Sequence, residues 1–447
     1  MNMRPVYLLF LFSFGVLSSI FAQNLPAGFT YETLASGISR PTVMAFAPDG
    51  RLFVCEQDGK IKIFKSGAIL PTPFAQLTVD GSGERGLLGI DFDPDFINNG
   101  FVYVYYTRNA SPRRNQVVRL TSDPANPDIM LPGSENLVLE FDNLSGATNH
   151  NGGFIQFGTD GKLYVSIGDN ASTANSQNYD TYLGNFLRIN PDGSAPVDNP
   201  FYATTPDGSP PTPASQRTWA IGLRNPYSFD INFSTGKIFV NDVGGNQYEE
   251  VNDATAPGQN FGWPTQEGPP QPGFDGPAYY YQNNNIGGST NATGCSVLGG
   301  EFFEPSYTNY PSQYQGKYFF MDYCNGWIRF IDPANTPATA SSLFGENFGF
   351  GLVNLTTGPD GNLYYLNRNQ TLNRIVYTPP LIESVASGSW NDTATWSCAC
   401  VPTGSDQVEI RTGHNVVVDG ITALAYGVNL EGGEIELRNS GVLQLKH

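Results

Sequence analysis

Residues 149–169 read NHNGGFIQFGTDGKLYVSIGD. Two short runs with strand-like alternation flank the turn Asp160-Gly161, in which Asp can bond its own backbone and Gly accepts positive φ. This stretch therefore predicts a β-hairpin. His150, one of only three histidines, precedes the hairpin in a loop of Asn and Gly. A scarce titratable ring at the mouth of a β-unit indicates a candidate general base. The alternative is an ordinary surface histidine.

The same hairpin pattern recurs along the chain. Its six copies cover residues 41–54, 89–104, 152–165, 228–240, 316–331 and 354–366. One hairpin cannot bury its apolar face, whereas a ring of such units can, and a ring also protects its edges. With 50 Gly, 33 Pro and no sustained helical period, the composition favours short strands. We predict an all-β fold with a six-bladed β-propeller over residues 24–380; an array of β-sandwiches is the alternative.

The two ends of the chain differ from the repeats. Arg4, the apolar run 6–21 and the small residue Ala22 predict a cleavable signal peptide over residues 1–22. No later stretch approaches the ~20 apolar residues of a transmembrane segment, so we expect a secreted or periplasmic protein. Beyond Pro380, short β runs predict a C-terminal β-rich module over residues 383–447, either β-helical or a β-sandwich. The module is expected to be incomplete and to attach the protein to a surface or matrix.

Charge and cysteine content narrow the possibilities. The net charge of −18 disfavours nucleic acid as a partner, while carboxylates can hold calcium. Cys295 and Cys324 flank one predicted hairpin region and are the favoured disulfide. Cys398 and Cys400 are separated by one residue, so a bridge between them is expected to be strained. Because the count of five cysteines is odd, at least one thiol is unpaired or bonded to another chain.

Polar residues gather at the predicted blade ends, where propeller loops surround the mouth of a central channel. The segments are Glu84-Arg85, Asn149-His150, Gly168-Asp169, Arg224-Asn225 and residues 242–250. Each has a structural alternative, such as an arginine that joins two blades or an aspartate that caps a turn. Their recurrence at equivalent places favours a functional site.

Several ordered motifs resemble those of the glucose/sorbosone dehydrogenase family, over roughly residues 28–377. They are Glu84–Gly89 with Asp93–Phe96, Asn149–Gly153, Gly168-Asp169, Leu183–Ile189 with Asp198–Phe201, Gly222–Pro226 and Asp242–Gly244. The resemblance implies a six-bladed propeller. It also implies oxidation of an aldose with calcium and pyrroloquinoline quinone (PQQ) as cofactors.

The resemblance also implies roles for individual residues. His150 would take the proton from the anomeric hydroxyl, Asp169 would orient His150, and Arg224 would lie beside the quinone oxygens. The other implied positions are Asn225 at the cofactor, Glu84 and Asn149 lining the same pocket, the carbonyls of Gly244 and Gly245 on calcium, and Glu250 at a second, structural calcium.

Two segments depart from the family pattern. Residues 321–327 and 346–354 contain no lysine or arginine, although the family places cations there for the carboxylates of PQQ. A hydrogen bond between such a cation and a PQQ carboxylate is worth ~1.5–3 kcal/mol, so its absence should weaken cofactor binding. The sequence Asp322-Tyr-Cys-Asn-Gly326 instead looks like the branch that includes the animal Hedgehog-interacting proteins, where a Cys295–Cys324 pairing is also expected.

Two functions follow from these patterns. The first is an exported sugar dehydrogenase that uses PQQ and calcium and passes electrons from a small sugar to an external acceptor. The second is a non-catalytic propeller that binds carbohydrate or protein. A propeller hydrolase of the lactonase type would need a carboxylate-rich calcium cluster at the channel centre, which these motifs do not provide.

Overall fold

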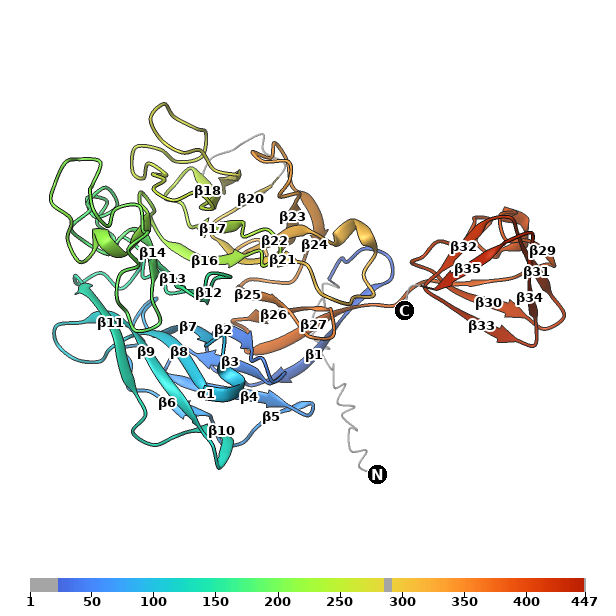
Figure 1. The fold of residues 1–447 in the computed structure, drawn as a ribbon, viewed down its shortest axis with the longest axis horizontal. Helices are drawn as coiled ribbons and strands as arrows, with labels where there is room; N and C mark the ends of the chain where they lie inside the picture. The colour runs from blue at the N-terminus through green and yellow to red at the C-terminus, as the bar shows by residue number, and fades with distance from the viewer. Residues whose placement is uncertain (1–22, 285–291, 446–447) are drawn as a thin grey trace, which may run out of the picture.

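The computed structural model describes residues 23–284 and 292–445. The expected signal peptide, residues 1–22, lies outside the described residues. The described chain is almost entirely β-structure, with one short α-helix, α1 (Phe96–Asn99). None of its helices is long and apolar enough to cross a membrane. Six mainly antiparallel sheets form a ring, which confirms the predicted propeller (Figure 1).

Each sheet is one blade, and its first strand lies at the central channel. The strands in sheet order are as follows. Blade one holds β2 (Pro41–Phe46), β3 (Leu52–Glu56), β4 (Lys60–Lys65) and β5 (Ala68–Ile69), with β6 (Ala75–Gln76) beside β4. Blade two holds β7 (Leu87–Phe92), β8 (Phe101–Thr107), β9 (Arg114–Asp123) and β10 (Asn126–Met130), with β11 (Asn136–Asn143) beside β9. Blade three holds β12 (Ile155–Phe157), β13 (Leu163–Ile167), β14 (Asn185–Ile189) and β15 (Thr218–Ala220). Blade four holds β16 (Pro226–Ile231), β17 (Ile238–Asp242), β18 (Tyr248–Asp253), β19 (Tyr279–Asn283) and β20 (Thr293–Gly294). Blade five holds β21 (Val297–Phe303), β22 (Lys317–Asp322), β23 (Ile328–Ile331) and β24 (Ser342–Gly345). Blade six holds β25 (Leu352–Thr357), β26 (Leu363–Asn367), β27 (Thr371–Tyr377) and β1 (Phe29–Ser36).

The ring closes because β1 pairs antiparallel with β27, placing Tyr31 opposite Ile375. Blade six therefore combines three strands from the end of the propeller with one from its start. Carboxyl groups of the first strands link successive blades. The backbone N–H groups of Phe157, Phe302 and Thr357 donate to Asp91 (2.6 Å), Asp230 (2.6 Å) and Glu301 (3.0 Å), each on the preceding blade.

The Asp-Gly turns behave as their chemistry requires. The Oδ1 atom of Asp160 accepts the N–H of Lys162 at 3.0 Å, and Gly161 adopts a φ of +69°. The fifth repeat was placed one strand late, since residues 316–331 cover β22 and β23, the second and third strands of their blade. The first strand is β21, which a long connection rather than an Asp-Gly turn joins to β22.

The eight strands that follow β27 pair in parallel. They form three faces: β28 (Leu381–Glu383), β30 (Gln407–Arg411) and β33 (Gly427–Glu431); β29 (Gly388–Ser389), β31 (Asn415–Asp419) and β34 (Glu434–Arg438); β32 (Thr422–Ala425) and β35 (Val442–Leu445). Parallel pairing between successive coils is typical of a β-helix rather than a sandwich. Figure 1 shows these strands set apart from the ring.

The five cysteines form two disulfides and leave one thiol unpaired. Cys295 and Cys324 form the expected disulfide, and Cys55 is unpaired and buried. Cys398 and Cys400 are also bonded, with their Cα atoms 5.1 Å apart. Ala399, between them, adopts a φ of +52°, in the left-handed region that a non-glycine residue seldom occupies, so the backbone carries the expected strain.

Candidate functional site

A cavity of about 390 Å³ lies at the end of the channel where the first strands begin and the second strands end. We call it the mouth cavity. Seven of the nine expected site residues line it: Glu84, Asn149, His150, Arg224, Asn225, Gly244 and Gly245. The other two, Asp169 and Glu250, are buried and do not line it. The structure thus brings together residues that come from blades two, three and four.

The His150 backbone is held in an unusual conformation. Its φ of +55° lies in the left-handed region, which a non-glycine residue seldom occupies. The Oε2 atom of Glu84 accepts the N–H of His150 at 2.8 Å, and the carbonyl of His150 accepts the N–H of Asn170 at 3.2 Å. Both bonds fix the turn that aims the imidazole into the cavity. Glu84, which lines the cavity, therefore fixes the backbone of His150.

The imidazole of His150 pairs with Asp169. The Nδ1 atom lies 2.7 Å from Oδ1 of Asp169, whose carboxylate is 1% exposed. A carboxylate partner favours the tautomer with its proton on Nδ1, which leaves the Nε2 lone pair for the cavity. Asp169 also accepts the N–H of Ala171 at 2.7 Å and the indole N–H of Trp263 at 3.1 Å. The pair is thus arranged as an oriented base.

Two guanidinium groups line the mouth cavity. Arg224 donates from Nη1 to the carbonyl of Val243 at 3.0 Å, and Arg368 donates from Nη2 to Oε1 of Gln57 at 2.8 Å. Within the described chain, neither guanidinium makes a salt bridge to a carboxylate. Their charge is therefore available to an anionic ligand. The amide oxygen of Asn225 accepts the N–H of Gly152 at 3.0 Å, which joins blades three and four.

The Gly244-Gly245 loop turns its N–H groups into the protein. Gly244 donates to Oε2 of Glu249 at 3.1 Å, and Gly245 donates to Oε1 of Glu267 at 2.8 Å. That Glu267 oxygen also accepts the N–H groups of residues 246, 247 and 248. No donor from the described residues reaches the carbonyl oxygens of Gly244 or Gly245. Oxygen ligands of this kind suit calcium.

Two acidic side chains beneath this loop, Glu249 and Glu250, are buried. Burial raises the pKa of Glu249 to about 8, and burial followed by repulsion from Asp242 raises the pKa of Glu250 to about 8. The Glu250 oxygens accept the N–H of Gly268 at 2.5 Å and the side-chain amide of Asn252 at 3.2 Å. These partners hold Glu250 behind the loop, so its assignment to a second calcium stays a prediction.

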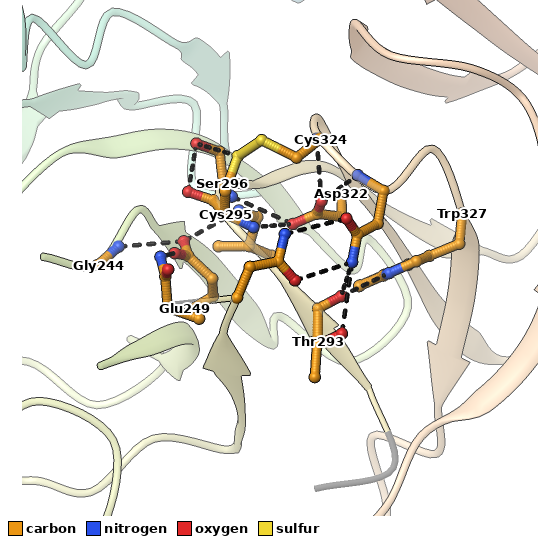
Figure 2. The surroundings of a disulfide bond; sticks show 12 residues. Gly244, Glu249, Thr293, Cys295, Ser296, Asp322, Cys324 and Trp327 are labelled. Carbon is orange, nitrogen blue, oxygen red and sulfur yellow. Dashed lines mark hydrogen bonds between the residues drawn. A yellow bond between two sulfur atoms is a disulfide. The ribbon is translucent and has the colours of Figure 1, made fainter. Parts of the chain in front are cut away.

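The Cys295–Cys324 disulfide supports another part of the cavity wall (Figure 2). It joins the segment before β21 to the segment after β22, and these segments carry the cavity residues Ser296 and Tyr323. Asp322 accepts the backbone N–H groups of Cys295 at 2.9 Å and Ser296 at 3.1 Å. It also accepts the N–H of Cys324 at 2.9 Å. The acid and the disulfide together fix this wall.

Several cavity residues lie outside the sequence motifs, above all Arg368. Residues 321–327 and 346–354 do lack lysine and arginine, but Arg368 enters the cavity from the end of β26. A positional signal was present. In blades one, four, five and six the residue directly after the second strand lines the cavity, and these residues are Gln57, Val243, Tyr323 and Arg368.

Comparison with known proteins agrees with this geometry. The family model described as Glucose / Sorbosone dehydrogenase matches residues 38–374. The chain is 27% identical over 280 residues to Quinoprotein glucose dehydrogenase B of Acinetobacter calcoaceticus, covering 56% of this chain and 55% of that protein. It is 30% identical over 225 residues to the human Hedgehog-interacting protein, covering 44% and 31% respectively.

The chain thus spans about half the length of the first relative and less than a third of the second. A solved structure, the PQQ-bound form of an aldose sugar dehydrogenase from Streptomyces coelicolor, is 25% identical. The match covers 79% of this chain and all of that one, with a TM-score of 0.61. The chain therefore belongs to the glucose/sorbosone dehydrogenase family.

Proposed function

We propose that the protein is an exported, calcium-assisted aldose dehydrogenase that oxidises the anomeric hydroxyl of a sugar with PQQ. The observation that carries the proposal is one cavity lined by an oriented histidine and by two guanidinium groups that have no carboxylate partner among the residues the structure describes. Such a set can bind an anion and accept a proton at adjacent places.

The residues present fit PQQ, which carries three carboxylates. Arg224 and Arg368 would bind the anionic groups of the cofactor, and the carbonyls of Gly244 and Gly245 would hold calcium against it. When bound, PQQ would supply a quinone as the hydride acceptor for the sugar's C1 carbon, and calcium would supply Lewis acidity. Arg368 supplies a cation that the sequence patterns did not provide.

The protein's own part in the reaction is proton removal and charge stabilisation. Nε2 of His150 would accept the proton of the anomeric hydroxyl while the C1 hydrogen leaves as hydride, so that the sugar becomes a lactone. Asp169 would stabilise the resulting imidazolium through the 2.7 Å contact at Nδ1. Arg224 would stabilise negative charge at the end of the cavity near the Gly244 loop. An external acceptor would then reoxidise the cofactor.

The decisive experiment reconstitutes the purified mature chain with PQQ and Ca²⁺ and measures dye reduction with a panel of aldoses. We expect sugar-dependent reduction that needs both additions. Absence of PQQ binding at micromolar concentration, together with absence of turnover for every sugar, would overturn the proposal.

A second candidate function is a non-catalytic propeller that binds carbohydrate or protein and is attached to a surface or matrix by strands β28–β35. The 30% identity to the Hedgehog-interacting protein favours it. Binding of a glycan or protein by a chain that does not bind PQQ would support this alternative.

A further inference from the structure

One indole touches the three chemical groups of the site. Nε1 of Trp263 donates to Oδ2 of Asp169 at 3.1 Å. The Arg224 guanidinium carbon lies 5.5 Å from the centre of the same ring, within the range of a cation–π contact. A Cβ placed on Gly245 would lie only 2.9 Å from Cη2 of Trp263, so the ring edge also packs against the carbonyl-bearing loop.

Backbone bonds fix the position of this indole. The N–H of Trp263 donates to the carbonyl of Gly222 at 3.0 Å, two residues before Arg224. The carbonyl of Trp263 accepts the side-chain amide of Gln177 at 3.0 Å. Asp169 is joined to the same region, because its N–H donates to the carbonyl of Arg224 at 2.8 Å. The ring therefore has a defined place between the aspartate and the arginine.

The indole N–H, on Oδ2, and the N–H of Ala171, on Oδ1, together orient the Asp169 carboxylate. A carboxylate can rotate about its Cβ–Cγ bond, and the donor on Oδ2 keeps Oδ1 facing Nδ1 of His150. Without that donor, the bond to His150 loses one of the restraints that fix its geometry, and the preference for a proton on Nδ1 weakens. The ring face meanwhile supports the Arg224 guanidinium, which has no carboxylate partner among the described residues.

We propose that Trp263 is a positioning residue that holds the His150–Asp169 base and the Arg224 cation in one fixed geometry. It acts through Asp169 by its N–H and through Arg224 by its ring face, and it does not line the mouth cavity. The inference rests on the proposed function for the chemical roles of His150 and Arg224. The contacts themselves are independent of that function.

The test separates the two contacts. Trp263→Phe removes the N–H but keeps a ring beneath Arg224, whereas Trp263→Leu removes both. For Trp263→Phe we expect kcat to fall about tenfold or more while KM for the sugar changes by less than about twofold, since transition-state stabilisation is lost. The affinity for PQQ should fall only in Trp263→Leu. In the double variant Asp169→Asn/Trp263→Phe, the loss of kcat should be much smaller than the two single-variant losses combined, because both changes act on the same contact.

Trp219→Phe is the matched control. The Trp219 indole also donates its N–H, to the carbonyl of Ala254 at 2.8 Å, and also lies beneath an arginine, Arg188, at 5.3 Å. Trp219 lies on β15, away from the mouth cavity. Its substitution should leave kcat, KM and PQQ affinity unchanged.

A second readout needs no cofactor. With only three histidines in the chain, the imidazole nitrogen spectrum of the apo protein can be assigned by comparison with His150→Ala. The parent protein should show His150 with its proton on Nδ1, and Trp263→Phe should show a mixture of tautomers. Trp263→Tyr, which also lacks the indole N–H, replaces Trp263→Phe if the latter does not fold.

The proposal is overturned if the Trp263 variant matches Trp219→Phe in both turnover and tautomer. If the parent protein shows no PQQ-dependent turnover, the proposed function fails, and the tautomer comparison alone then decides the role of Trp263.

Discussion

His150 occupies a conformation that its own chemistry does not favour. A non-glycine residue at φ near +55° costs on the order of 1 kcal/mol or more, and bonds from Glu84 and Asn170 on either side stabilise it. Strain that neighbouring residues maintain at a cavity is typical of a functional position. The conformation turns the ring toward Asp169 and leaves Nε2 at the cavity.

Replacement of this ring tests the base assignment. We expect His150→Ala to lower kcat by about 10²–10⁴-fold, because a general base contributes that much, while PQQ affinity stays within about threefold. Dye-reduction kinetics and cofactor titration measure the two effects. His414→Ala is the control, since that histidine bonds Ser384 in the segment after β27. Retained turnover in His150→Ala would remove the assignment.

Arg368 is the second residue whose role can be isolated. Arg368→Gln should weaken PQQ binding by roughly tenfold or more, because a hydrogen bond to a charged group contributes ~1.5–3 kcal/mol. Titration of the apo protein with PQQ measures this change. Arg438→Gln removes an exposed guanidinium that bonds Glu436 on β34 and should have no effect. Equal affinities for the two variants would show that Arg368 does not hold the cofactor.

At the scale of elements, the site is built from equivalent positions of the repeat. The residue after the second strand faces the cavity in several blades, so the repeat itself predicts where functional side chains lie. The sequence patterns located His150, Arg224 and Gly244 because each stands in a distinct Gly- or Asn-rich motif. Arg368 has no such motif. Its place at the cavity follows only from its position directly after the second strand of blade six.

The fifth blade shows a related limit. Its first strand contains Gly299 and Gly300, which interrupt the alternation, and no Asp-Gly turn follows it. The pattern was therefore recognised only from β22 onward. For the strands β28–β35 the sequence left a β-helix and a β-sandwich as alternatives, because short β runs separated by turns fit both; the parallel pairing favours the β-helix.

The two disulfides should differ sharply in their effect. Removing Cys295–Cys324 by a double Cys→Ser change opens a loop of sequence separation 29 and should lower the free energy of unfolding by ~2–4 kcal/mol. It should also raise KM, because Ser296 and Tyr323 line the cavity. The same change at Cys398 and Cys400, with sequence separation 2, should cost much less. Denaturant unfolding and steady-state kinetics measure both effects, and equal losses of stability would contradict the argument.

At the scale of the whole molecule, several carboxyl groups of the propeller have raised pKa values. Burial raises the pKa of Asp91 to about 7 and that of Asp230 to about 6, and each carboxyl accepts a backbone N–H from the next blade. Burial likewise raises the pKa of Asp242 to about 7, beneath the mouth cavity. The net charge of −18 adds general repulsion as these groups ionise.

These raised values determine how stability depends on pH. A carboxyl whose pKa is higher in the folded chain binds protons more tightly there than in the unfolded chain. Its contribution to the free energy of unfolding is therefore fully present below the unfolded pKa near 4 and is lost as pH rises through the folded pKa. We therefore expect the free energy of unfolding, measured with urea in the presence of a chelator, to fall between pH 5 and pH 8.

Asp91→Asn isolates one of these groups without touching the mouth cavity. Asp91 lines a second cavity, of about 1020 Å³, at the opposite end of the channel, and an amide oxygen can still accept the N–H of Phe157. Because one pKa unit corresponds to ~1.4 kcal/mol, the variant should be at least about 1 kcal/mol more stable than the parent at pH 8. The difference should shrink as pH falls and become small only below the unfolded value near 4. Asp180→Asn, at an exposed position, should leave the pH profile unchanged. A parent profile that rises from pH 5 to pH 8, or an Asp91→Asn profile parallel to that of the parent, would show that the channel carboxyls do not control stability.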